Sequence, residues 1–156
     1  MNNSQLHETM NTGLFVGSFD PFTIGHASVV RRALQLFDRL VIGVGTNADK
    51  QPQQSAEERA TAITQLYTDD PRITVKTYQG LTVDFATECG AQFLIKGVRS
   101  VKDFEYEREQ ADINRRLTGI ETLLLFAEPG MEAISSSLVR ELKAHDHDIT
   151  EYLPRK

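Results

Sequence analysis

The chain has 156 residues, of which 40% are hydrophobic and 25% are charged, and its formal net charge is −5. This length and composition are typical of one globular domain with a core of its own. The acidic balance argues against a general nucleic-acid-binding protein, whose surface is usually basic. No apolar run approaches the roughly 20 residues of a membrane-spanning helix, so we expect no membrane segment.

The N-terminus is polar and lacks the basic and apolar layout of a signal peptide. We predict a disordered polar lead-in over residues 1–11 and a single domain over residues 12–156. Cys89 is the only cysteine in the sequence, so the chain has no disulfide framework. A lone cysteine fits a reducing compartment, and we therefore expect a cytoplasmic protein.

The stretch from Thr12 to His26 combines an apolar run, a turn-rich connection and the start of a helical pattern. A helix N-terminus offers unpaired N–H groups and a partial positive charge, which together favour phosphate. Gly17 and Gly25 have no Cβ, so we expect the backbone to approach an anion closely there. Ser18 and His26 add side-chain donors to the same turn.

Strand and helix patterns alternate along the chain, which indicates βαβ units and a parallel sheet. We predict an α/β, Rossmann-like fold in one domain, with five parallel strands and helices on both faces. The predicted strands are residues 14–16, 40–44, 73–78, 93–95 and 122–127. The predicted helices are residues 27–37, 55–67, a short helix from 82 to about 89, a long one from after 103 to 117, and 135–143.

Right-handed crossovers place every connection from a strand to a helix at one edge of such a sheet, where ligands bind. The functional candidates obey this rule, because each follows a predicted strand. No G-x-G-x-x-G fingerprint follows the first strand, which argues against an NAD enzyme. In the order of the chain, the candidates are residues 17–26, Lys50, Thr82, residues 96–99 and residues 134–137.

Three motifs together resemble the phosphopantetheine adenylyltransferase family of the nucleotidyltransferase superfamily. They are G-S-F-D-P-F-T-I-G-H, which ends in a T-x-G-H element at residues 23–26, then K-G-V-R-S-V-K-D-F-E-Y-E at 96–107, and I-S-S-S-L-V at 134–139. The resemblance runs from about residue 12 to residue 154. It implies transfer of the adenylyl group of ATP to 4′-phosphopantetheine, which gives dephospho-coenzyme A and pyrophosphate in coenzyme A biosynthesis. Members of this family are usually homohexamers.

The resemblance also implies roles for individual residues. His26 is expected to contact the nucleotide phosphates and to stabilise the transition state. The residues expected to bind the acceptor are Ser18, Lys50, Thr82 and Lys96. The residues expected to bind ATP, besides His26, are Ser18, Phe19, Gly97, Val98, Arg99, Glu107, Met131, Glu132, Ala133, Ile134, Ser135, Ser136 and Ser137.

Three positions depart from the family pattern. Lys96 stands where the family usually has arginine, and it offers a point charge in place of a two-pronged donor. Met131 stands where the family often has an aromatic residue, and Thr82 where it has an apolar one. Within the second motif, we interpret Asp103 and Glu105 as part of a solvated helix face.

No cluster of carboxylates for a metal is visible in the sequence, so we expect Mg²⁺ to arrive with ATP. Two other nucleotidyltransferase activities remain open, namely a cytidylyltransferase and an adenylyltransferase of nicotinate mononucleotide. The T-x-G-H form and the I-S-S-S loop disfavour the first of these. A non-enzymatic nucleotide-sensing protein of the same fold is the third alternative, and the retained His26, Arg99 and serine run disfavour it.

Overall fold

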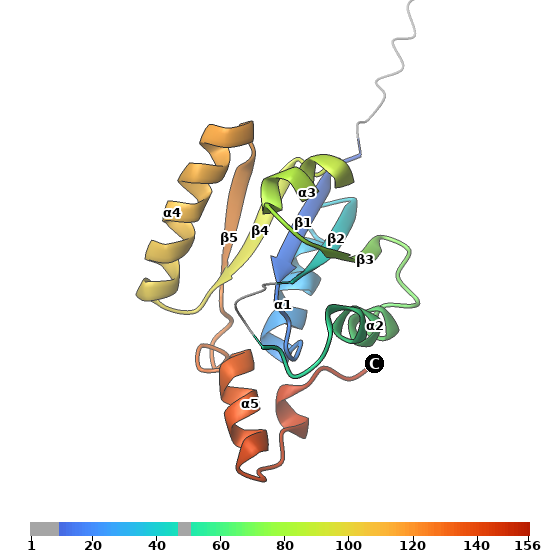
Figure 1. Ribbon diagram of the computed structural model, residues 1–156, viewed down its shortest axis with the longest axis vertical. Coiled ribbons are helices and arrows are strands. Elements are labelled where there is room, and N and C mark those ends of the chain that lie inside the picture. The colour runs from blue at the N-terminus through green and yellow to red at the C-terminus, as the bar shows by residue number, and fades with distance from the viewer. Residues whose placement is uncertain (1–9, 47–50) are drawn as a thin grey trace, which may run out of the picture.

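The computed structural model describes residues 10–46 and 51–156, and the predicted Lys50 site therefore lies outside the described residues. Its centre is a five-stranded parallel sheet with the strand order β3-β2-β1-β4-β5 (Figure 1). This architecture confirms the predicted Rossmann-like α/β fold. The strands are β1 (Thr12–Gly17), β2 (Arg39–Gly45), β3 (Ile73–Tyr78), β4 (Phe93–Val98) and β5 (Glu121–Phe126).

Helices connect the strands, and the last helix lies beyond the carboxyl ends of β1 and β4 (Figure 1). The chain moves from β1 outward to β3, returns across β1 to β4, and then continues to β5. The helices are α1 (Ile24–Ala33), α2 (Ala56–Leu66), α3 (Thr82–Cys89), α4 (Val101–Thr118) and α5 (Ser136–Ala144), followed by the 3-10 turn η1 (Thr150–Tyr152).

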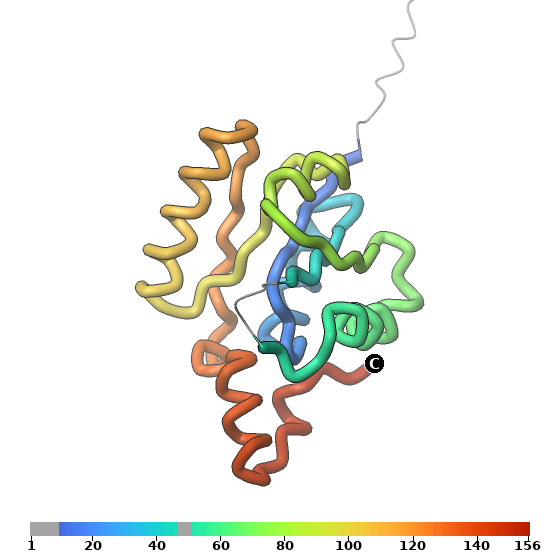
Figure 2. Tube along the Cα trace, viewed as in Figure 1, coloured from blue at the N-terminus to red at the C-terminus, as the bar shows by residue number. Residues whose placement is uncertain are grey.

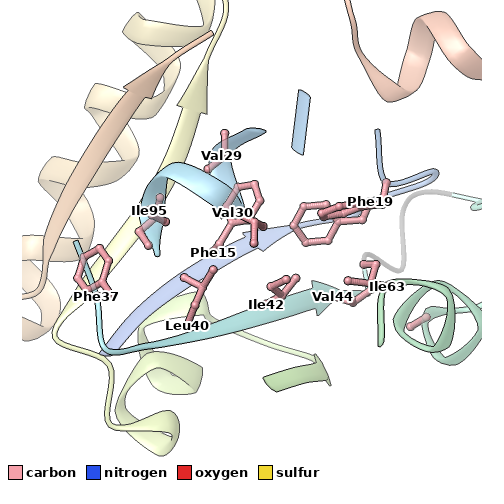
Figure 3. Packing of buried hydrophobic residues seen from close by; sticks show 13 residues of the cluster. Phe15, Phe19, Val29, Val30, Phe37, Leu40, Ile42, Val44, Ile63 and Ile95 are labelled. Carbon is pink, nitrogen blue, oxygen red and sulfur yellow. The ribbon is translucent and has the colours of Figure 1, made fainter. Parts of the chain in front are cut away.

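The central strand β1 divides the hydrophobic core into two clusters, one on each face of the sheet. Phe15 points into the larger cluster, where residues of α1 and α2 pack against the sheet (Figure 3). Leu14 and Val16 point to the opposite face and pack against α3. Successive strand residues alternate between faces, so a strand covered on both sides has to be apolar throughout. The burial of β1 therefore holds the turn that follows it on a rigid support.

Two element boundaries near the site differ from the prediction. The first helix begins at Ile24, because the Thr23 side chain caps it, and it ends at Ala33. The fourth strand continues to Val98, and α4 then begins at Val101, capped by Ser100. Residues 96–98, predicted as a loop, are thus held in the sheet, where their hydrogen bonds fix the orientation of their side chains.

At the N-terminus, Asn11 is joined to the loop before β2. Its backbone N–H donates to Asp38 Oδ2 at 2.8 Å, and its carbonyl accepts from the N–H groups of Asp38 and Arg39.

Within the described residues, no helix combines the length and the apolar character needed to cross a bilayer.

The Gly43→Ala variant tests the packing between β2 and α3. A Cβ at Gly43 would lie 2.8 Å from the Phe85 ring, which is stacked on Tyr78 at a centroid distance of 4.5 Å. Overpacking of this kind typically costs about 1–3 kcal/mol. We expect a lower urea midpoint for Gly43→Ala with an unchanged m-value. Thr74→Ala, on an exposed position of β3, serves as the control and should stay within about 0.5 kcal/mol of the wild type.

Candidate active site

A cavity of about 400 Å³ opens at the carboxyl end of the sheet, where β1 and β4 diverge. This is the switch point of the strand order, the place where open α/β sheets bind ligands. The turn after β1, the end of β4 and the first turns of α1, α4 and α5 all contribute to its wall. The predicted residues that line it are Ser18, Phe19, His26, Lys96, Gly97, Val98, Arg99, Glu107, Met131, Ile134, Ser135, Ser136 and Ser137.

Among the described residues, three of the predicted ones do not line this cavity. Thr82 follows β3, two strands away from the switch point, and its hydroxyl lies 3.0 Å from the hydroxyl of Tyr78. Glu132 and Ala133 are exposed on the outer side of the loop before α5, where Glu132 Oε2 accepts from the N–H of Gly130 at 2.9 Å. Their predicted roles in ligand binding stay predictions that the cavity wall does not support.

His26 is the third residue of α1, and its hydrogen bonds define its tautomer. The Thr23 N–H donates to His26 Nδ1 at 2.9 Å, while the Thr23 side chain caps the helix by accepting from the His26 N–H. A backbone N–H can only donate, so Nδ1 of His26 has to be unprotonated. The neutral ring therefore carries its proton on Nε2, which leaves Nε2–H as the donor available to a ligand.

Two phenylalanine rings enclose the His26 ring. Phe19 meets it edge-on at a centroid distance of 5.0 Å, and Phe22 lies at 5.3 Å. Burial among these rings, together with the nearby Arg99 charge, lowers the pKa of His26 from 6.5 to about 4. The imidazole is consequently neutral at pH 7. Gly17 serves the same packing, because a Cβ there would lie 3.0 Å from the Phe19 ring. Gly17 also lines the cavity, and the approach of its backbone to an anion stays a prediction.

The turn after β1 and the start of α5 lie near each other (Figure 2), although more than 100 residues separate them in sequence. Hydrogen bonds join the two segments. The Ser136 hydroxyl donates to the Pro21 carbonyl at 2.7 Å, and Arg140 donates to the Asp20 carbonyl at 2.6 Å. Asp20, interpreted from the sequence as a turn residue, is buried, and its carboxylate accepts from the Gln53 N–H at 3.1 Å. These contacts hold two phosphate-favouring helix ends at one cavity.

The serines at the start of α5 have different hydrogen-bond partners. Ser135 caps the helix by accepting from the Leu138 N–H, and the Ser137 hydroxyl accepts from Arg140 at 3.2 Å. The first N–H groups of a helix have no partner within it, so those of Ser136 and Ser137, which have no acceptor among the described residues, remain available to an anion. The run is thus a helix cap, as its composition indicates, and at the same time part of the cavity wall.

The charged side chains from β4 and α4 form ion pairs across the cavity wall. Lys96 Nζ lies 3.6 Å from Glu107 Oε2, and Arg99 Nε lies 3.4 Å from Asp103 Oδ2. Asp103 therefore belongs to the site, and its interpretation as part of a solvated face is wrong. These pairs are partly exposed, so their strength is modest and phosphate groups can compete for both cations.

Two further groups at the cavity were missed in the sequence analysis. Arg140 lies one helical turn after Ser136, a spacing that puts both on one face of α5 and could have revealed it. Glu128 accepts from the Ser28 hydroxyl and pairs with Arg31 and Arg32. The Ser28 hydrogen bond and these two charges hold the pKa of Glu128 below its usual value. No local sequence pattern predicts this second cluster, which consists of Ser28, Arg31, Arg32 and Glu128.

Comparisons with known proteins agree with this geometry. Residues 14–142 match the family model described as cytidylyltransferase-like. Phosphopantetheine adenylyltransferase from Bacteroides thetaiotaomicron is 52% identical over 145 residues, which cover 93% of this chain and 96% of that protein. The protein of the same name from Leuconostoc citreum is 42% identical, and the match covers 94% of this chain and 93% of that protein.

The chain belongs to the phosphopantetheine adenylyltransferase family. A putative nicotinate-nucleotide adenylyltransferase from Vibrio parahaemolyticus has the same fold, with a TM-score of 0.66, 17% identity and coverage of 94% of this chain and 95% of that one. At this identity, the likeness concerns the fold alone. Membership of the phosphopantetheine adenylyltransferase family therefore rests on the sequence relatives, which extend over nearly the full length of both chains.

The protonation of His26 gives a prediction for NMR. We expect the His26 ring to titrate near pH 4 and to show the Nε2–H tautomer at pH 7, as read from its ring nitrogen shifts. Because the pKa is lower in the folded chain than in the unfolded one, the unfolded state binds the proton first as the pH falls. The free energy of unfolding should therefore decrease between about pH 6.5 and 4.

The His26→Gln variant provides the control for this titration. Its side chain does not ionise, so the part of the pH dependence that His26 contributes should disappear from the unfolding curves. A His26 titration near 6.5, or a proton on Nδ1, would contradict the hydrogen-bond assignment.

Proposed function

We propose that the protein transfers the adenylyl group of ATP to 4′-phosphopantetheine, with release of pyrophosphate, and so forms dephospho-coenzyme A. An oxygen of the acceptor phosphate attacks the α-phosphorus of ATP in line, and the bond from that phosphorus to the bridging oxygen of the β-phosphate breaks. No protein nucleophile is needed, because the acceptor phosphate is itself the nucleophile. The observation that best supports this proposal is the convergence of donors on one cavity at the switch point.

Catalysis of this reaction depends on positioning and on charge neutralisation, since negative charge builds up around the α-phosphorus. His26 Nε2–H, the Ser18 hydroxyl and the free N–H groups of α1 are neutral donors in the cavity wall. A neutral imidazole suits this role, because it donates a hydrogen bond without giving up its proton to the phosphate.

The cavity wall also offers cationic groups for the remaining phosphates. We assign Arg99 and the α5 N-terminus to the departing pyrophosphate, and Lys96 to the acceptor phosphate, together with Lys50, which lies outside the described residues. In the cavity wall, Glu107 Oε2 lies 3.6 Å from Lys96 Nζ. When a phosphate replaces Glu107 as the partner of Lys96, the Glu107 carboxylate becomes free to accept a hydrogen bond from a hydroxyl or amino group of the nucleotide.

We infer that Mg²⁺ enters as part of the Mg²⁺–ATP substrate. Among residues 10–46 and 51–156, no three histidine, cysteine or acidic side chains lie close enough together to hold a metal ion. Phosphate oxygens and water are the ligands that Mg²⁺ commonly keeps in such sites. The protein then has to hold the phosphates, and the ion neutralises part of their charge.

A pyrophosphate-release assay distinguishes the alternative acceptors. We expect pyrophosphate release from ATP with 4′-phosphopantetheine. CTP should not replace ATP efficiently, and nicotinate mononucleotide should not replace 4′-phosphopantetheine efficiently. Release with another pair at a comparable kcat/KM would reassign the substrate. ATP binding without release for any acceptor would favour the nucleotide-sensing alternative.

His26→Ala tests the mechanism. Loss of one transition-state donor typically lowers the rate by a factor of about 100 to 1,000. We expect such a loss in kcat, with little change in the affinity for ATP measured by calorimetry. Thr74→Ala, remote from the cavity, should keep wild-type kinetics. A His26→Ala variant that turns over at nearly the wild-type rate would rule out the donor role of His26.

We also propose a homo-oligomer, a hexamer by resemblance, located in the cytoplasm. None of the residues of α4 is buried, and Tyr106, Ile113 and Leu117, which share one face at helical spacing, are all more than 45% exposed. An apolar helix face of this extent favours burial against another copy. Light scattering should give about 105 kDa, six times the chain mass of 17.5 kDa. Ile113→Glu should lower that mass, whereas a wild-type mass of one chain would exclude the hexamer.

A further inference from the structure

Arg59, on α2, is a buried arginine whose described partners are backbone carbonyl groups. It is 3% exposed. Its Nε donates to the Gln54 carbonyl at 3.1 Å, and one terminal nitrogen donates to the Gly45 carbonyl at 3.3 Å and to the Ser18 carbonyl. Three connections therefore meet at one guanidinium, namely the end of β1, the end of β2 and the approach to α2.

The contact with Ser18 fixes the orientation of a peptide group at the cavity. In a trans peptide, the C=O and the following N–H point in opposite directions. The Ser18 carbonyl points towards Arg59, so the N–H of Phe19 has to point away from it. This N–H has no acceptor among the residues that the structure describes, and both Ser18 and Phe19 line the cavity.

The backbone at this turn needs such support. Phe19 has a φ of +51°, in the left-handed region that residues with a side chain rarely adopt. Conformations of this kind persist where the surrounding structure holds them in place, and they concentrate at functional sites. Here the hydrogen bond from Arg59 holds the Ser18 carbonyl, and packing against His26 holds the Phe19 ring.

We propose that Arg59 is a positioning residue that aligns the Ser18 hydroxyl and the Phe19 N–H on the nucleotide phosphate. It lies behind the cavity wall and acts through the peptide between Ser18 and Phe19, without touching the substrate. The charge on its guanidinium polarises that peptide and strengthens the Phe19 N–H as a donor. This inference rests on the proposed adenylyl transfer.

Two substitutions separate positioning from folding. Arg59→Lys keeps the charge but replaces the planar fork with a single ammonium, which cannot reproduce the same three contacts. Arg59→Met keeps the length and removes every donor. Ile63→Val, on the same helix and fully buried, serves as a matched control that lowers stability but removes no hydrogen bond to the Ser18 carbonyl. All variants are assayed well below their melting temperatures.

We expect kcat/KM for ATP to fall about 10- to 100-fold in Arg59→Lys, the loss that a small displacement of a donor produces, and further in Arg59→Met. Ile63→Val should stay within about twofold of the wild type, even where its melting temperature is as low as that of Arg59→Lys. Arg59→Lys kinetics within twofold of the wild type, or a loss no greater than that of Ile63→Val, would overturn the proposal.

A second measurement does not depend on the acceptor. Addition of Mg²⁺–ATP alone should shift the Phe19 amide resonance in the wild type and in Ile63→Val, and the shift should be much smaller in Arg59→Lys. An equal shift in all three proteins would contradict the role of Arg59. If the wild type shows the amide shift but releases no pyrophosphate with 4′-phosphopantetheine, the proposed function fails and the positioning role stands.

Discussion

Hydrogen bonds between the turn after β1 and the start of α5 are the contacts on which the site depends. Ser136 and Arg140 donate to the carbonyl groups of Pro21 and Asp20, so the last helix is fastened to the first turn of the fold. Without these bonds, the two helix N-termini would have no fixed distance between them. With them, unpaired N–H groups from distant parts of the chain face one cavity, where phosphate is the anion that they suit best.

The electrostatics of this cavity follow from the same packing. Phe19 and Phe22 remove water from His26, and the neighbouring Arg99 further disfavours a second positive charge. The imidazole is therefore a neutral donor, while the cations around it are balanced by Asp103 and Glu107 until a ligand competes for them. The site combines fixed neutral donors with exchangeable charges, an arrangement that suits the transfer of a group between two phosphates.

The five parallel strands, the helices and most of the cavity wall could be predicted from the sequence, whereas the spatial order of the strands comes from the structure. The apolar runs at β1 and β2 indicate strands covered on both faces, and the glycine- and serine-rich turns after β1 and before α5 indicate phosphate seats. Arg59 and Arg140 could not be found in this way. Each donates to a carbonyl group at least 41 residues away in sequence, and a contact with the backbone leaves no pattern in the residue that accepts it. Asp103 was misjudged because an acidic residue in a first helical turn is usually solvated.

The orientation of the reacting groups is best tested by a crystal structure with 4′-phosphopantetheine and an ATP analogue in which a methylene group replaces the oxygen between the α- and β-phosphates. We expect the α-phosphate within hydrogen-bond distance of His26 Nε2 and the Phe19 N–H, with the acceptor phosphate on Lys96 and in line with the bond that breaks. An α-phosphate bound away from both His26 and the Ser18 turn would contradict the proposed active site.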